Sequence, residues 1–156
     1  MNKHQRIGVK SNAHAGKDFE LKIQNYFKSI KGIDLQAGFP LEVGVNKIKK
    51  THNFDFGSSK NHLIVECKSH KWTESGKIPV AKLTAWNEVM LYFIASPPYF
   101  EKILIVLKDY NAKRKTTLGE YYLNIYGHFI PQNIQIWEFD EDKNEMKTIY
   151  KNEKTV

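Results

Sequence analysis

The sequence predicts one α/β domain in which a mixed central sheet is flanked by helices. Three observations support this fold class: stretches with helical spacing alternate with short apolar runs, those runs have strand length, and no repeat, low-complexity tract or linker divides the chain. With 156 residues, of which 41% are hydrophobic, the chain can bury one core but is short for two. We therefore expect a single domain over residues 1–156.

The first half of the chain predicts one helix and three strands. Apolar residues recur at helical spacing between Gly16 and Ile30, and Gly32 supplies a stop. Extended segments are expected at residues 35–45, 52–56 and 62–68, with a basic turn after the first and a polar turn after the second. The last has an unbroken apolar centre, which predicts a strand buried on both faces.

The second half predicts two more helices and two more main strands. A helix is expected from Pro79 until Ser96 and two prolines stop the pattern, then a buried strand from Lys102 to Leu107. Helical spacing from Thr116 to Phe129 precedes a strand over residues 133–139, and a short strand over residues 146–150 can follow. The expected order is αβββαβαβ.

Charge and cysteine content limit the classes of function. A net charge of +7 favours a polyanionic partner such as nucleic acid. The single cysteine, Cys67, excludes an internal disulfide, and the polar opening from Met1 to Ser11 does not resemble a secretory signal. No apolar run reaches the roughly 18 residues needed to cross a bilayer. We expect a cytoplasmic protein without membrane contact.

One of four Glu-x-Lys triplets stands in an unusual context. Glu66 and Lys68 end the strand with the apolar centre, and Asp55 lies on the strand before it. Because strand side chains alternate, Glu66 and Lys68 share a face, about 7 Å apart along the strand. Pairing of the two strands would bring the Asp55 carboxylate close to that of Glu66.

Two carboxylates that meet would repel each other unless a cation neutralised them. Oxygen ligands suit Mg²⁺ or Mn²⁺, which also bind phosphate oxygens, so phosphodiester hydrolysis is the expected reaction. Lys68 would act on the attacking water or steady the phosphoryl transition state. The alternative is that Glu66 and Lys68 form an ordinary ion pair at a strand end while Asp55 ends a hairpin.

Asp55, ten intervening residues and then Glu66-Cys67-Lys68 resemble the PD-(D/E)XK motif of the restriction-endonuclease-like nuclease superfamily. The common core of that superfamily runs helix, three strands, helix, strand, and residues 16–107 are similar to it in order. The resemblance implies a Mg²⁺-dependent endonuclease that hydrolyses DNA, with Asp55, Glu66 and Lys68 as catalytic residues. Phe54 stands where the motif's name has proline.

Members of this superfamily often place a further acid on the first helix, and Glu20 lies where that acid is expected. The resemblance therefore implies that Glu20 joins Asp55 and Glu66 as a catalytic residue and metal ligand. The alternative is an acid in the first helical turn that is favoured by the helix dipole.

Further basic residues are candidates for contacts with the DNA backbone: Lys17, Lys71, Lys77 and Lys82. The alternative is that they are solvated surface residues. His52, His62 and His70 flank the motif strands, but with one cysteine their spacing matches no structural zinc site. Cys67 alternates away from Glu66 and Lys68, which indicates a packed core residue.

The leading hypothesis is thus a restriction-like endonuclease on duplex DNA. One site cuts one strand, so cutting both strands suggests a homodimer. The alternatives are a Holliday-junction resolvase, a repair-type structure-selective nuclease, or a DNA-binding module of the same fold without catalysis.

Overall fold

The first helix covers one face of the sheet. The computed structural model describes residues 12–151, so the polar opening Met1 to Ser11 lies outside the described residues. Helix α1, Asn12–Tyr26, continues as the π-helical turn η1, Phe27–Lys31, and ends at Gly32, whose φ of 66° is left-handed. Phe19, Ile23 and Phe27 of the predicted apolar stripe are buried, whereas Ile30 at its end is exposed. The stop is confirmed, although the helix starts four residues before the expected position.

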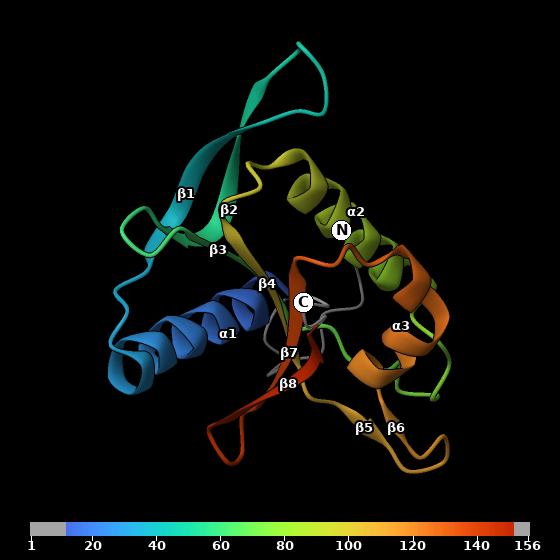
Figure 1. Cartoon of the computed structure of the whole chain (residues 1–156). Coiled ribbons are helices and arrows are strands. Elements are labelled where there is room, and N and C mark those ends of the chain that lie inside the picture. The colour runs from blue at the N-terminus through green and yellow to red at the C-terminus, as the bar shows by residue number, and fades with distance from the viewer. Residues whose placement is uncertain (1–11, 152–156) are drawn as a thin grey trace, which may run out of the picture.

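Six strands form one mixed sheet in the order β1-β2-β3-β4-β7-β8 (Figure 1). Their bounds are Gln36–Val43, Lys50–Ser58, Leu63–Lys68, Glu101–Leu107, Ile134–Asp140 and Glu145–Lys151. The two central pairs, β3 with β4 and β4 with β7, are parallel, and the three outer pairs are antiparallel. The expected mixed sheet flanked by helices is therefore confirmed.

Helices α2, Val80–Ala95, and α3, Leu118–Tyr126, pack on the opposite face from α1 (Figure 1). The short 3₁₀ helix η2, Gly127–Phe129, follows α3. The third helix begins two residues later than expected, because β6, Thr116–Thr117, pairs with β5, Tyr110–Asn111, in a small hairpin. Thr117 then caps α3 in a capping box with Glu120.

The hydrophobic core lies on both sides of the sheet. Ile64 belongs to the cluster under α2 and α3, whereas Val65 belongs to the cluster under α1. Every residue of β3 from Leu63 to Cys67 is buried, which confirms the strand predicted to be covered on both faces. A charged group on this strand is therefore held in a rigid and largely dry setting.

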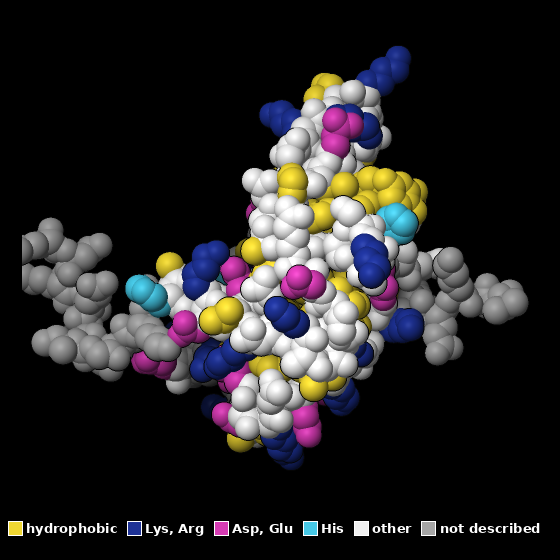
Figure 2. All heavy atoms as spheres, turned by 90° about the vertical axis from the view of Figure 1, so that its left-hand side faces the viewer, with side chains coloured by type: hydrophobic (Ala, Val, Ile, Leu, Met, Phe, Trp, Pro, Cys, Tyr) yellow, Lys and Arg dark blue, Asp and Glu magenta, His cyan; other side chains and the backbone are white. Residues whose placement is uncertain are grey.

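The β1–β2 hairpin projects beyond the helical layers, and lysines gather at its end (Figures 1 and 2). These are the exposed Lys47, Lys49 and Lys50 of the expected basic turn. Strands β1 and β8 form the two edges of the sheet; Pro40 lies within β1, and the β7–β8 register shifts between Ile136 and Trp137. No helix within residues 12–151 is both long and apolar enough to cross a membrane.

Candidate active site

Asp55 lies where strands β2 and β3 separate. The β2–β3 ladder pairs Phe56 with Val65 and does not continue to Asp55. Phe54 packs under α2 while Phe56 packs under α1, although strict alternation would put both on one face, so the strand is irregular at Asp55. The Asp55 carboxylate fills the opening, where its Oδ2 accepts a 2.8 Å hydrogen bond from the backbone N–H of Cys67.

Glu66 and Lys68 project from the end of β3 toward α2. The distance between Lys68 Nζ and Glu66 Oε2 is 3.8 Å, and Glu66 is the more deeply buried of the two. Both side chains line a hollow of about 140 Å³, together with His52 from β2 and with Ala85, Glu88, Val89 and Tyr92 from α2. The expected shared face is therefore observed, with one wall supplied by the helix.

Glu66 is held in an environment that disfavours its negative charge. The pKa of Glu66 is raised to about 8, first by burial and then by the charge of the neighbouring Asp55, while Lys68 opposes both. The side chain of Asp55 is also within hydrogen-bonding range of Glu66. In the metal-free protein at neutral pH, Glu66 therefore retains a proton that a divalent cation would displace.

His52 contacts Glu66 from the neighbouring strand, a role that the sequence reasoning missed. Its Nε2 lies 3.4 Å from Glu66 Oε1, and its ring stacks on that of Tyr92 with centroids 3.7 Å apart. Burial lowers the pKa of His52, so the neutral imidazole is favoured and can donate through Nε2 to Glu66 Oε1. The sequence indicated only that His52 was near the motif; its partner depends on how β2 and α2 pack.

Glu20 approaches from the opposite face of the sheet. Its carboxylate pairs with Lys17 at 3.0 Å and is about one quarter exposed. The charge of Glu20 acts on the buried Cys67 thiol, whose pKa is raised first by burial and then by Asp55 and Glu20, so Glu20 lies on the α1 side of the site. A role for Glu20 as a third ligand stays a prediction.

The residues present fit a hard divalent cation that is bound mainly by other oxygens. Within residues 12–151, no three His, Cys, Asp or Glu side chains come close enough to hold an ion alone. Asp55 and Glu66 could supply two carboxylates, which would leave the remaining positions to water and phosphate oxygens. This is how Mg²⁺ is usually bound in phosphate-handling sites.

The four candidate DNA-contact lysines are exposed, and they do not form one group. Lys17 is paired with Glu20 on α1, and Lys82 is on α2, where its charge helps to lower the pKa of His70. Lys71 and Lys77 belong to the segment that follows β3, and Lys77 lines a second hollow. Their predicted contacts with phosphate remain predictions.

The remaining motif residues have structural roles. Cys67 is buried and packs in the cluster under α1, as its position in the strand predicted. Burial and the charges of Lys82 and Lys68 lower the pKa of His70 to about 4, and its Nδ1 accepts a 2.8 Å hydrogen bond from Trp86 Nε1. His62 makes edge contacts with the rings of Tyr99 and Phe100.

Comparison with known proteins adds no relative. No family model matches this chain, and no similar protein is found among curated sequences or among solved structures.

Proposed function

We propose that this chain is a metal-dependent endonuclease that hydrolyses phosphodiester bonds of DNA, with a restriction-endonuclease-like core. The observation that carries the proposal is the position of Asp55. Its carboxylate enters the opening between β2 and β3 beside the buried Glu66, and Lys68 Nζ lies 3.8 Å from Glu66. An ordinary ion pair at a strand end would not need a second acid next to it.

The arrangement of the elements gives independent support. The three strands that follow α1, then α2 and β4, occur in the order of the superfamily core that the motif resembles. In this order β3 lies at the centre of the sheet with β2 beside it, and α2 closes one side of the site. The membership and the activity both rest on this combination of motif and topology.

The side chains would divide the work of hydrolysis. Asp55 and Glu66 would hold Mg²⁺ or Mn²⁺, which supplies charge for the phosphoryl group and lowers the pKa of a bound water. Lys68, whose ammonium stays beside Glu66, would orient the attacking water and stabilise negative charge on the phosphate. His52 would keep the Glu66 carboxylate in its binding orientation through Nε2.

A direct test measures cleavage of three substrates by the full chain: supercoiled plasmid, a four-way junction and RNA, each with Mg²⁺, Mn²⁺ or EDTA. We expect metal-dependent cutting of DNA, reduced at least about a hundredfold by Asp55→Asn and by Lys68→Ala. Glu145→Gln and Lys147→Ala are matched controls because they alter an exposed triplet of the same spacing on β8.

The substrates separate the alternatives. Preference for the junction would favour a resolvase, and nicking of one strand by monomers would argue against a symmetric pair of chains cutting both strands. Metal-independent DNA binding without any cleavage would identify a non-catalytic module. Cleavage that survives both site variants would refute the proposed site.

A further inference from the structure

A second hollow, separate from the carboxylate site, is lined by positive charge. It encloses about 390 Å³ between the turn after β3 and the β5–β6 turn. Its lining residues are Ser75, Gly76, Lys77, Lys113 and Arg114. Three of these five residues are cationic and none is acidic, so the hollow attracts anions.

Arg114 is fixed in place before any ligand arrives. Its Nε donates a 3.1 Å hydrogen bond to the carbonyl of Gly76, and its guanidinium lies 5.3 Å from the centre of the Trp72 ring. Trp72 is buried and bonded twice to Asp109, through its backbone N–H at 2.8 Å and its indole N–H at 3.0 Å. An arginine held in this way loses little conformational entropy on binding.

The cations of the hollow have no internal counter-charge. Among residues 12–151, the ion pairs to carboxylates involve Lys17, Lys22, His52, Lys68 and Lys108, and none involves Lys77, Lys113 or Arg114. The hydrogen bond of Arg114 to Gly76 uses Nε and leaves the terminal nitrogens of the guanidinium for an external acceptor. Phosphate oxygens match this paired donor geometry.

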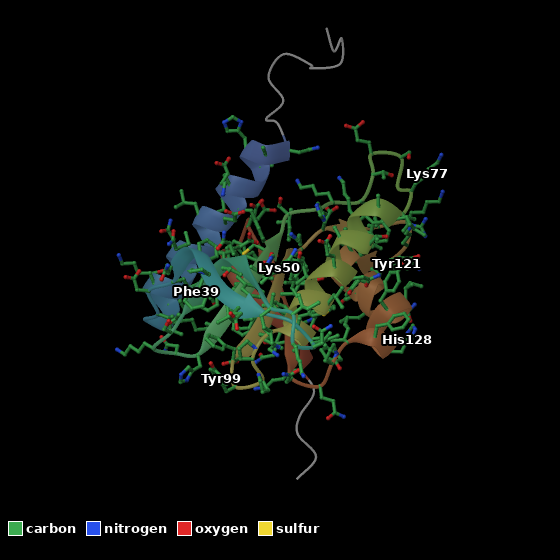
Figure 3. All side chains as sticks on the ribbon, turned by 90° about the horizontal axis from the view of Figure 1, so that it is seen from above. Phe39, Lys50, Lys77, Tyr99, Tyr121 and His128 are labelled. Carbon is green, nitrogen blue, oxygen red and sulfur yellow. The ribbon has the colours of Figure 1, made fainter. Side chains whose placement is uncertain are left out.

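The hollow lies at the same end of the central strands as the candidate active site. The segment with Lys77 leaves β3 directly after Lys68, and β5 follows the end of β4, which is parallel to β3. Because β3 and β4 are parallel, their C-terminal ends lie side by side. The Trp72–Asp109 bonds join the segment after β3 to the segment after β4 there. Figure 3 shows Lys77 on the same side of the molecule as the first turn of α1.

We propose that this hollow binds a backbone phosphate of duplex DNA at a point away from the cleaved bond. The inference rests on the proposed function for the choice of ligand, since a DNA strand that passes Glu66 and Lys68 can continue along the C-terminal ends of β3 and β4. Arg114 binds the phosphate through its guanidinium, Lys77 and Lys113 add positive charge, and Trp72 sets the position of the guanidinium.

The test is equilibrium binding of a labelled DNA duplex in EDTA, followed by fluorescence anisotropy at several salt concentrations. Arg114→Ala removes one phosphate contact, so the slope of log affinity against log salt should fall by about 0.9, and affinity at 0.1 M salt should fall about eightfold. Lys77→Ala with Lys113→Ala should act in the same direction, and within residues 12–151 these two exposed side chains make no hydrogen bond or ion pair whose loss would affect folding. Arg114→Lys should keep the slope but lose part of the affinity.

The matched control is the double variant Lys28→Ala with Lys60→Ala. Both lysines are exposed and lie away from the hollow, Lys28 in η1 after α1 and Lys60 in the turn that precedes β3. Binding of the Lys77 and Lys113 double variant at wild-type strength, or an equal loss in the Lys28 and Lys60 double variant, would overturn the proposal. So would equal dependence on Arg114 for binding of polyglutamate, which would indicate an acidic protein partner.

Binding in EDTA is independent of catalysis, so the two proposals fail separately. If cleavage depends on Asp55 but Arg114→Ala leaves DNA binding unchanged, only this inference fails. If DNA binding depends on Arg114 but no cleavage occurs, only the proposed nuclease activity fails.

Discussion

The carboxylate of Asp55 accepts a hydrogen bond from the backbone N–H of Cys67, at the point where the β2–β3 ladder has ended. A side chain thus takes the position that a strand carbonyl would otherwise occupy. The catalytic candidate is therefore also part of the sheet, and a change at this residue affects both the site and the fold.

Asp55→Ala and Asp55→Asn should separate these two effects. Alanine leaves the buried N–H of Cys67 without its acceptor, which costs about 1–3 kcal/mol of unfolding free energy. Asparagine retains an oxygen acceptor and should stay within about 1 kcal/mol of the wild type, while both variants lose the charge. Urea unfolding in EDTA measures the difference, and equal destabilisation by the two changes would contradict the argument.

Glu66→Gln should stabilise the metal-free protein at alkaline pH. The pKa of Glu66 is raised from 4.5 to about 8, so between these values the folded state holds a proton that the unfolded state releases. Stability is therefore lost as pH rises through this window, and the amide avoids that loss, by roughly 1–3 kcal/mol at pH 9.

Denaturant unfolding at pH 5 and pH 9 measures the effect of Glu66→Gln, and its advantage should appear only at the higher pH. Millimolar Mg²⁺ should then restore stability to the wild type but not to the variant, because ligands stabilise the state that binds them. A constant difference at both pH values would rule out titration of Glu66 as its cause.

His52→Ala should weaken metal binding without removing a ligand. His52 contacts Glu66 Oε1 at 3.4 Å and is stacked on Tyr92, so its loss frees the carboxylate to rotate. Loss of a side chain that holds a metal ligand in position lowers metal affinity or activity about 10–100-fold. The Mg²⁺ concentration for half-maximal cleavage should rise, whereas the exposed control His128→Ala should leave it unchanged.

Gly57→Ala should destabilise the fold. A Cβ at this position in β2 would lie 2.3 Å from two ring atoms of Phe39, which crosses the strand there. Overpacking of this kind costs about 1–3 kcal/mol. The control Gly16→Ala in α1 meets no atom within 4 Å and should instead gain about 0.5–1 kcal/mol in thermal unfolding.

The His70–Trp86 bond predicts a loss of stability in acid. The pKa of His70 falls from 6.5 to about 4 in the folded state, chiefly through burial, so the unfolded state takes up a proton first as pH drops. Unfolding free energy should decrease between pH 6.5 and pH 4 by roughly 1–2 kcal/mol, after allowance for partial exposure. His70→Gln keeps an acceptor for Trp86 Nε1 and should show a shallower decline.

Local patterns in the sequence were enough for most of the fold. The spacing of Phe19, Ile23 and Phe27 marked the buried face of α1, and the apolar centre of β3 marked a strand covered on both sides. The β5–β6 hairpin was missed because its strands are two residues long and pass directly into a helix. The capping-box spacing of Thr117 and Glu120 is a local signal that could have placed that helix start.

The candidate site depended more on tertiary packing. Its three motif residues could be found from spacing and context, but His52 reaches Glu66 only because β2 is irregular at Asp55 and α2 brings Tyr92 beside it. The contact of Arg114 with Gly76 likewise spans 38 positions along the chain. Patterns within one segment carry no information about such distant pairs.

The outer strands of the sheet also influence how the protein behaves at high concentration. Exposed strand edges are templates for intermolecular pairing. In β1, Pro40 lacks the amide proton that a docking strand would require, and β8 pairs through an irregular register and presents Lys147 and Lys151. Both borders thus discourage the growth of fibrillar aggregates through the open sides of the sheet.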